Sequence, residues 1–339
     1  MDGGGVEGHS RQLATRSGVS DFKVLAGEHP ELTHWHGNVG EAVALDLAGP
    51  LVRGVTTLDV LSWNVAIGLG RLEEVINKVR AGELDGEVRR ANRPLVVLVQ
   101  EAFRADVTVP EHSQSRHHGG KAPRHARGDI VDIAHRLGLS LRYAPSMRNG
   151  AHRSDRGNAI LSSVSIEHAR AFALPHVRQR RIAVAAELHG LPMLTFVSAH
   201  LDTRRARVQL QSGRLLQATA LGRQLADEWG TDQSVVLGAD FNSYLGTREP
   251  MFEELRRSGF TRLAHNGRTR HTFHARDVRM LLDHILIRTT PATIAGAQVV
   301  RLDETAGDRE AAVFGSDHHP LLARIELTPR FRRIKRQGE

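Results

Sequence analysis

The chain has 339 residues, 40% of them hydrophobic, which is enough for one large domain or two small ones with a substantial core. It contains no cysteine, which excludes a disulfide framework and cysteine-rich metal sites and fits a reducing compartment. The formal net charge is +8, and all but four of the 46 basic residues are arginine. A basic surface attracts polyanions such as nucleic acid, although this arginine skew is equally typical of coding bias.

Residues 1–42 are rich in glycine and histidine and have little hydrophobic periodicity. We expect a partly disordered lead-in, with His34 and His36 in an ordinary loop rather than at a metal site. The beginning of the chain lacks an apolar signal core, and no run approaches the roughly 18 apolar residues of a membrane span. We therefore expect a cytoplasmic protein without stable membrane insertion.

The first half of the remaining sequence alternates strand and helix patterns. Residues 43–64 predict two strands joined at Gly49 and Pro50, and residues 71–80 predict a helix with one apolar face. Residues 95–101 predict a strand, and residues 129–137 a second helix. Between these two lies a polar insertion at 104–128, in which histidine and basic residues are frequent. It is either a loop that grips phosphate or a solvated surface loop.

The second half predicts a hairpin, a long helix and further strands. Residues 181–187 and 194–200 form the hairpin, which turns at His189 and Gly190, and residues 204–229 read as a helix weakened at Gly213. Strand patterns follow at 234–237, 283–287 and 321–327, and residues 329–339 form a basic tail. The tail could bind an anionic surface, but a solvated tail is favoured.

Polar side chains recur at the ends of these apolar strands. Each of these apolar runs begins or ends at a residue whose side chain is an amide, a carboxylate or an imidazole. The residues are Asn64, Glu101, His200, Asp240 with Asn242, Asp283, and Asp317 with His318. Because ligands commonly bind at strand ends in sheet proteins, such recurrence indicates one converging site. The period-2 alternation of a strand also places Asp240 and Asn242 on one face.

Seven short runs resemble, in order, the motifs of the endonuclease/exonuclease/phosphatase superfamily, which includes deoxyribonuclease I-like nucleases, neutral sphingomyelinases and inositol-polyphosphate phosphatases. The runs are LSWN (61–64), QE (100–101), RGNAILS (156–162), AHLD (199–202), GADFN (238–242), LDHIL (282–286) and SDHHP (316–320). The resemblance spans about 55–328. It implies an α/β fold, a deoxyribonuclease I-like four-layer sandwich in which two packed mixed β-sheets are flanked by helices. We accordingly expect one domain at 43–328.

The resemblance also implies a hard divalent cation, Mg²⁺ with Mn²⁺ as a possible substitute. Glu101 would be the principal ligand, assisted by Asn64 and by Asp317 directly or through water. Mg²⁺ prefers oxygen ligands and keeps several waters, which fits such a set.

The implied catalytic residues surround the scissile phosphate. Asp240 would orient or deprotonate the attacking water, and Asn242 would hold that water or a phosphate oxygen. His318 would stabilise the transition state, with its ring fixed and kept protonated by Asp283. His200 would donate to a phosphate oxygen or protonate the leaving group. Asn158 is a lesser candidate for substrate contact.

These residues predict a metal-dependent hydrolase of phosphate esters, foremost a phosphodiesterase or nuclease acting on nucleic acid as a monomer. The alternative is a phosphoesterase for a lipid headgroup or small phosphate ester, because RGNAILS and AHLD resemble the sphingomyelinase and phosphatase branches equally well. A non-catalytic nucleic-acid-binding module is a minor third reading. Residues 104–128, 142–156 and 262–278 are expected to shape substrate choice. His271 and His274 could suggest zinc, but a structural role is favoured.

Overall fold

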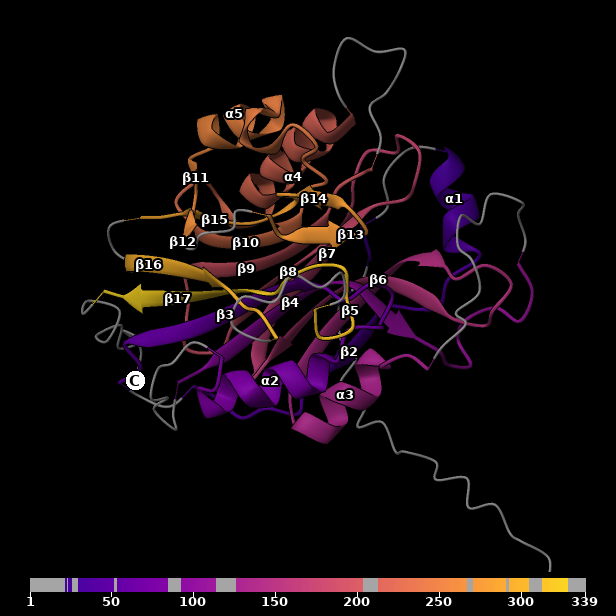
Figure 1. Ribbon diagram of the computed structural model, residues 1–339, viewed down its shortest axis with the longest axis horizontal. Helices are drawn as coiled ribbons and strands as arrows, with labels where there is room; N and C mark the ends of the chain where they lie inside the picture. Colours follow the sequence, from indigo (N-terminus) through magenta and orange to yellow (C-terminus); the bar gives the residue numbers. More distant parts are fainter. Residues whose placement is uncertain are drawn as a thin grey trace, which may run out of the picture.

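Two β-sheets packed face to face, with helices on both outer faces, make up the architecture (Figure 1). The computed structural model describes residues 22, 24–25, 30–51, 54–84, 93–113, 126–203, 213–266, 271–290, 293–304 and 313–328. The predicted four-layer α/β sandwich is confirmed. Among the described residues, no helix is both long and apolar enough to cross a membrane.

The first sheet has seven strands. In spatial order they are β1 (Val24–Leu25), β7 (Ile166–Ala173), β8 (Ile182–Leu188), β9 (Leu194–His200), β10 (Ser234–Asp240), β15 (Asp283–Arg288) and β11 (Phe260–Arg262). β9 and β10 are parallel, whereas β8 pairs antiparallel with β9 and β15 pairs antiparallel with β10. The predicted hairpin is thus confirmed as β8 and β9.

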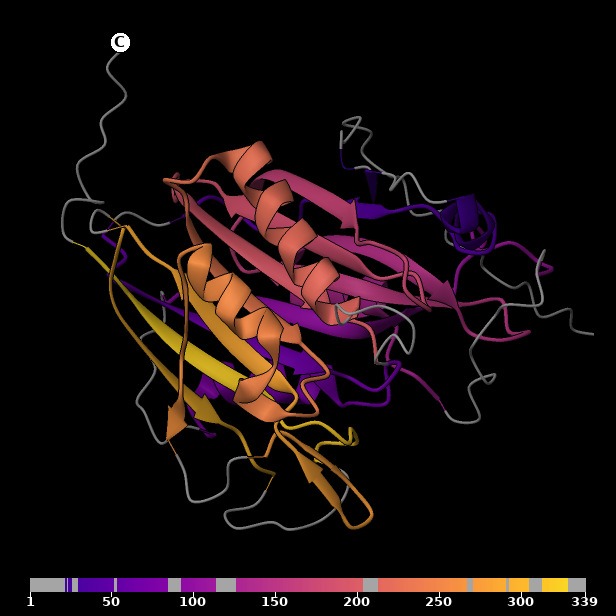
Figure 2. The same ribbon diagram turned by 90° about the horizontal axis from the view of Figure 1, so that it is seen from above.

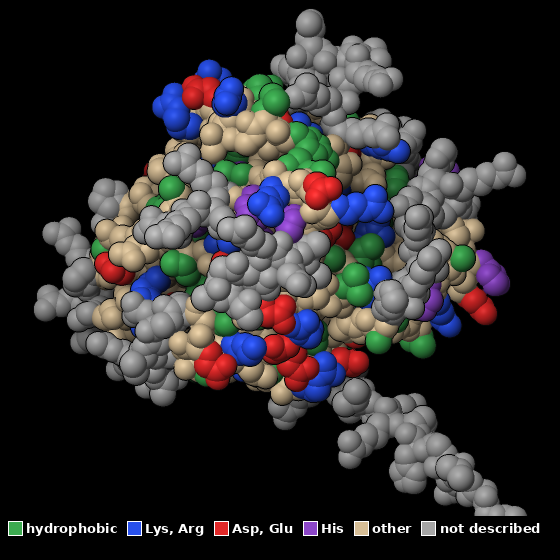
Figure 3. All heavy atoms as spheres, viewed as in Figure 1, with side chains coloured by type: hydrophobic (Ala, Val, Ile, Leu, Met, Phe, Trp, Pro, Cys, Tyr) green, Lys and Arg blue, Asp and Glu red, His purple; other side chains and the backbone are tan. Residues whose placement is uncertain are grey.

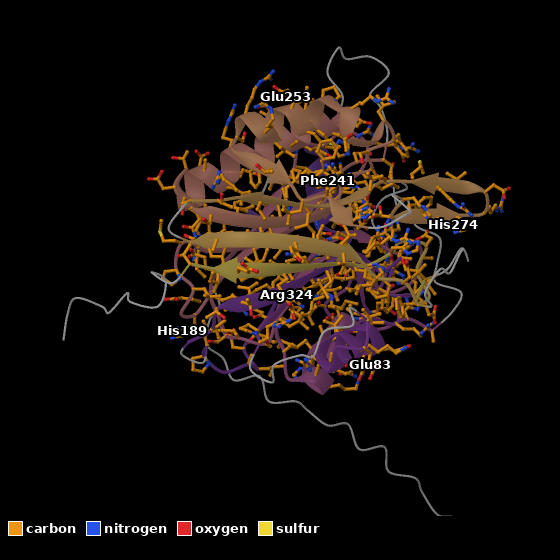
Figure 4. All side chains as sticks on the ribbon, turned by 60° about the vertical axis from the view of Figure 1, so that its left-hand side comes forward. Glu83, His189, Phe241, Glu253, His274 and Arg324 are labelled. Atoms are coloured by element: carbon orange, nitrogen blue, oxygen red, sulfur yellow. The ribbon has the colours of Figure 1, made fainter. Side chains whose placement is uncertain are left out.

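The second sheet has eight strands. In spatial order they are β12 (His265–Asn266), β16 (Ile294–Arg301), β17 (Leu321–Leu327), β3 (Thr57–Asn64), β4 (Leu95–Arg104), β6 (Asp155–Ser162), β5 (Ser140–Arg148) and β2 (Val43–Leu45). β3 and β4 are its parallel central pair. A separate hairpin of β13 (Phe273–Ala275) and β14 (Val278–Met280) projects from the sandwich, as Figure 4 shows beside the label of His274.

Helices cover the outer face of each sheet. α2 (Leu72–Ala81) and α3 (Ile130–Leu137) lie on the eight-stranded sheet. α4 (Gly213–Trp229) and α5 (Pro250–Arg257), preceded by the 3-10 turn η1 (Gly246–Arg248), lie on the seven-stranded sheet (Figure 2). The carboxylate of Asp129 accepts the N–H of Val131 at 2.9 Å, which caps α3 where the sequence predicted its start.

Central strands are buried on both faces, which is why they read as continuous apolar runs. Leu58, Val60 and Leu98 face the other sheet, where they meet Phe196 and Val236. Their alternate neighbours Leu61, Val97 and Val99 pack under α2 and α3. The interior therefore has three layers, one between the sheets and one under each helical pair.

Several predicted boundaries were wrong or lie outside the described residues. His34 and His36 belong to helix α1 (Pro30–His36), not to a loop. Of the range 142–156, residues up to Arg148 form β5, and Asp155 begins β6. Three predicted segments lie outside the described residues: the start of the long helix (204–212), most of the polar insertion (114–125) and the basic tail (329–339).

Polar contacts tie the two sheets together at one end. The side-chain amide of Gln100 in β4 donates to Ser198 Oγ in β9 at 3.1 Å and to the carbonyl of Gly238 in β10 at 3.3 Å. The Ser198 hydroxyl returns a bond to the carbonyl of Val99 at 2.9 Å. A Cβ at Gly238 would lie 2.5 Å from Ser62 Oγ, so only glycine permits this close approach.

The buried histidine His284 should make stability depend on pH. It packs between Phe241 (Figure 4) and Phe252, and burial lowers its pKa to about 3. As pH falls below 6.5, the unfolded chain takes up a proton that the native state refuses, so stability is lost progressively toward pH 3. Between pH 7.5 and pH 4.5, we expect the free energy of unfolding of His284→Gln to fall by about 2 kcal/mol less than that of the wild type. Urea unfolding at the two pH values measures this, and equal losses would contradict it.

Candidate active site

Three predicted site residues lie side by side across neighbouring strands. The register of β9, β10 and β15 places His200 opposite Asp240, and Asp240 opposite Asp283. All three side chains are buried. The end of β10 is therefore flanked by an imidazole on one side and a carboxylate on the other.

Asp240 is the centre of the site. One carboxylate oxygen accepts the side-chain amide of Asn64 at 2.9 Å, and the other accepts the backbone N–H of Asn242 at 2.9 Å. Because Asn64 ends β3 in the opposite sheet, this contact joins both sheets. Burial and the nearby charge of Asp283 raise the pKa of Asp240 to about 7. A carboxylate that titrates near neutral pH is suited to accept a proton from water.

His318 is held as a cation beside Asp240. Its Nδ1 lies 2.8 Å from Asp283 Oδ2, and its Nε2 lies 3.9 Å from both Asp240 Oδ2 and Asp317 Oδ1. Burial alone would lower the pKa of His318, but the ion pair with Asp283, together with the charges of Asp240 and Asp317, outweighs burial and raises the pKa to about 10. The ring thus carries a proton on the nitrogen that faces the other carboxylates.

Backbone and side-chain bonds fix the loop that carries His318. Ser316 Oγ donates to the carbonyl of Asn64 at 2.7 Å, and the indole N–H of Trp63 donates to the carbonyl of His318 at 2.8 Å. The hydroxyl of Thr272 accepts the backbone N–H of Asp283 at 2.9 Å. Sequence reasoning did not single out Ser316 or Thr272, which act only through these tertiary contacts.

His200 has a different protonation state. The side-chain nitrogen of Asn242 lies 3.1 Å from His200 Nε2 and 3.0 Å from the carbonyl of Leu201. The same Nε2 lies 3.3 Å from Asp240 Oδ2, so His200 contacts both Asn242 and Asp240. Burial and the charges of Arg181, His318 and Arg156 hold the pKa of His200 well below its usual range. His200 is therefore neutral, and it orients the side chain of Asn242.

A β-bulge interrupts β4 at Glu101. The pairing of β4 with β6 shifts between Val99 and Ala102, and Glu101 adopts a left-handed φ of 54°. Val99 and Ala102 both pack toward the helices, so Glu101 is the extra residue of the bulge. Bulges of this kind re-aim side chains next to active sites.

The predicted metal ligands fit a hard cation. Glu101, Asp317 and Asn64 supply oxygen donors, and the first two are only partly buried, whereas Asp240 and Asp283 are fully enclosed. Burial and the like charge of Glu101 raise the pKa of Asp317, a repulsion that a divalent cation would relieve.

A second donor set lies deeper. Within the described ranges, Asp240, Asp283 and His318 form the one group of three whose ligand atoms lie within 4.8 Å of one another. The 2.8 Å ion pair already satisfies His318 Nδ1 and one oxygen of Asp283. We therefore interpret these three residues as groups that hold and transfer protons rather than as metal ligands.

Asn158 and the pair of His271 and His274 lie beside this centre: Asn158 is opposite the bulge of β4, and the backbone N–H of His274 donates to the carbonyl of Asp317 at 2.9 Å. The side-chain nitrogen of Asn158 donates to the carbonyl of Ile182 at 2.6 Å, so this residue bridges the sheets. His271 and His274 have ring centres 5.9 Å apart, and His271 packs 5.4 Å from His319, which pairs with Asp303 at 2.7 Å.

Replacing Asp283 should change the charge of His318. We expect Asp283→Asn to lower the pKa of His318 by about 1–3 units because the paired carboxylate is lost. The stabilisation by this pair is present below pH 6.5 and disappears as pH rises through 10, so the variant should be destabilised more at pH 6 than at pH 10. Imidazole NMR titration and unfolding at both pH values measure this. Asp303→Asn, which removes the partner of His319, is the matched control, and an equal effect on His318 would contradict the assignment.

Solved structures share this fold at low sequence identity. The human Nocturnin catalytic domain with bound sulfate has 14% identity and a TM-score of 0.54, over 85% of this chain and 97% of that one. An endonuclease/exonuclease/phosphatase protein from Beutenbergia cavernae has 16% identity and a TM-score of 0.53, over 80% and 72%. ANGEL2, a 2′,3′-cyclic phosphatase, has 14% identity and a TM-score of 0.52, over 80% and 95%. No curated protein matches the chain by sequence.

The family profile described as Endonuclease/Exonuclease/phosphatase family matches residues 61–318. That span covers every site residue discussed above and well over half of the chain. The chain belongs to the Endonuclease/Exonuclease/phosphatase family.

Proposed function

We propose that the protein is a divalent-metal-dependent phosphodiesterase that hydrolyses nucleic acid by in-line attack of water. The observation that carries this proposal is the pairing of a base with an acid across the site. Asp240 has a pKa of about 7, and the protonated Nε2 of His318 lies 3.9 Å from it. Membership of a family of phosphoesterases and nucleases supports the hydrolysis of a phosphate ester. A cytoplasmic location is part of the proposal.

Each residue of the proposed site has its own role in the reaction. Asp240 orients the attacking water and accepts its proton, while the amide of Asn242 binds that water or a phosphate oxygen. His318 donates its Nε2 proton in a hydrogen bond to the phosphate oxygens, where negative charge develops, and Asp283 keeps the ring of His318 protonated. His200 holds the amide of Asn242 in position. Proton donation to the leaving group then falls to His318 or to water, because the lowered pKa of His200 leaves it neutral.

A bound cation would supply Lewis acidity to the scissile phosphate and the leaving oxygen. Glu101, Asn64 and Asp317 would hold it. Mg²⁺ suits an all-oxygen set that leaves room for water, and Mn²⁺ has similar preferences.

Charge alone does not decide between nucleic acid and a small phosphate ester. Figure 3 shows acidic and basic side chains interspersed on the face it displays, with ion pairs over α5 and α2 rather than one basic patch. ANGEL2 is described as a 2′,3′-cyclic phosphatase, which keeps a small phosphate ester as the second candidate substrate.

Removing the base should abolish turnover without unfolding the protein. We expect Asp240→Asn to lower kcat by about 10²–10⁴ because the water loses its proton acceptor. Hydrolysis of bis(p-nitrophenyl) phosphate with Mg²⁺ measures this, and circular dichroism verifies folding. Asp303→Asn serves as a carboxylate control outside the site. Wild-type rates in Asp240→Asn would remove Asp240 from the mechanism.

Glu101 should govern the metal requirement. Glu101→Gln keeps the shape of the side chain and removes its charge, so we expect the Mg²⁺ concentration for half-maximal activity to rise at least tenfold. A metal titration of initial rates measures this, with Glu304→Gln as an acidic control beside α2. A superimposable titration would exclude Glu101 as a ligand.

The substrate class is tested by cleavage of supercoiled plasmid. We expect Mg²⁺-dependent nicking by the wild type and none by Asp240→Asn, which also controls for a contaminating nuclease. If neither protein nicks DNA while the wild type hydrolyses bis(p-nitrophenyl) phosphate, the nuclease assignment fails and the small-ester alternative stands.

A further inference from the structure

Three consecutive residues beside a predicted metal ligand have left-handed backbone conformations. Ala66, Ile67 and Gly68 have φ angles of 49°, 56° and 70°, and they begin two residues after Asn64, which ends β3. Glycine adopts such angles without steric cost, whereas a β-branched residue there is a genuine outlier. Among the residues that the structure describes, Ile67 is the one β-branched residue with a positive φ. This stretch, the 66–68 turn, therefore needs contacts that hold it.

Residues just before α3 supply those contacts. Arg127 Nη1 donates to the carbonyl of Ala66 at 2.8 Å and to the carbonyl of Ile67 at 3.0 Å. The backbone N–H of Gly128 donates to the carbonyl of Gly68 at 2.8 Å. Each carbonyl of the 66–68 turn thus accepts a hydrogen bond from this one short segment.

The 66–68 turn is bonded on its other side to Asn64. The backbone N–H of Ala66 donates to Asn64 Oδ1 at 3.0 Å. A backbone N–H can only donate, so this contact identifies the amide oxygen of Asn64, and the amide nitrogen is the atom that donates to Asp240 at 2.9 Å. An amide oxygen has two lone pairs, so one remains for a cation. Hydrogen bonds thus connect Arg127 to the side chain of Asn64 and, through it, to Asp240.

Arg127 also lies near the proposed cation site. Burial lowers the pKa of Arg127, and the charge of Glu101 acts in the opposite direction. A positive charge beside Glu101 repels a divalent cation, so loss of that charge alone would tighten cation binding. Loss of the bonds to the 66–68 turn would weaken cation binding instead, because the amide of Asn64 would be free to rotate. The sign of the change therefore separates the two effects.

We propose that Arg127 is a positioning residue that holds the 66–68 turn in its left-handed form and thereby orients Asn64 toward the cation and toward Asp240. This inference rests on the proposed function and adds to it a residue that touches neither substrate nor metal. Groups that bond to a metal ligand commonly fix its orientation and tune metal affinity. Strained backbone persists at functional sites only where surrounding contacts impose it, and the bonds of Arg127 are such contacts.

Hydrogen exchange in EDTA tests this role without metal or turnover. We expect the bonded amide proton of Ala66 to exchange at least tenfold faster in Arg127→Gln than in the wild type, because the turn opens locally. Arg153→Gln is the matched control, since Arg153 likewise donates to two backbone carbonyls, within residues 107–109. Urea unfolding verifies that both variants fold. Unchanged exchange of Ala66 in Arg127→Gln would overturn the proposal.

Cation affinity gives the second readout. Electron paramagnetic resonance of free Mn²⁺ measures the dissociation constant without substrate. We expect that constant to rise about 10–100-fold in Arg127→Gln, as it does when other groups bonded to a metal ligand are lost. It should keep the wild-type value in Arg153→Gln. A lower constant in Arg127→Gln would show that Arg127 acts through its charge, and the positioning role would be refuted.

A second-site change separates positioning from direct contact with the substrate. Ile67→Gly relieves the strain in the 66–68 turn, because glycine adopts a positive φ freely. The side chain of Ile67 is only partly buried, so its loss removes little packing. Added to Arg127→Gln, this change should restore most of the Mn²⁺ affinity and the slow exchange of Ala66. Failure to restore either one would contradict the proposal.

The two proposals fail separately. Fast exchange of Ala66 in Arg127→Gln, reversed by Ile67→Gly, in a protein that binds no Mn²⁺ and hydrolyses no ester would refute the proposed function. The link between Arg127 and Asn64 would still stand. Hydrolysis that depends on Asp240, with exchange and Mn²⁺ affinity unchanged in Arg127→Gln, would do the reverse.

Discussion

The polar bonds between the two sheets are the constraint on which the site depends. Apolar contact between sheets is non-directional, so it cannot by itself align Asn64 of one sheet with Asp240 of the other. The bonds of Gln100 with Ser198 and Gly238 fix that alignment a few residues from the chemistry. The contact of Asn64 with Asp240 at 2.9 Å is another of these bonds between the sheets, so residues of the proposed site also help to align the two sheets.

Much of this arrangement was predictable from sequence. Apolar runs locate the central strands because burial on both faces leaves no alternation, and their polar last residues mark the converging end. The motifs also identified the pairing of Asp283 with His318 before any distance was known. The order of the motifs along the chain, however, does not say which strands are adjacent in a sheet. The side-by-side placement of His200, Asp240 and Asp283 follows only from the strand register.

The remaining features depend on tertiary contacts, which leave no recognisable pattern in the sequence around each residue. Glu101 lies in a bulge that no glycine marks in the sequence, because its left-handed conformation is imposed by the pairing of β4 with β6. Asn158 carries a family motif but bonds to backbone carbonyls of the opposite sheet.

We propose that the strand-end residues form a metal-dependent phosphoesterase centre with the cation on the partly exposed side. Anomalous diffraction from crystals grown with Mn²⁺ tests this most directly. We expect a peak in contact with Glu101 and close to Asn64 and Asp317. No peak there, or a peak held by His271 and His319 instead, would contradict it.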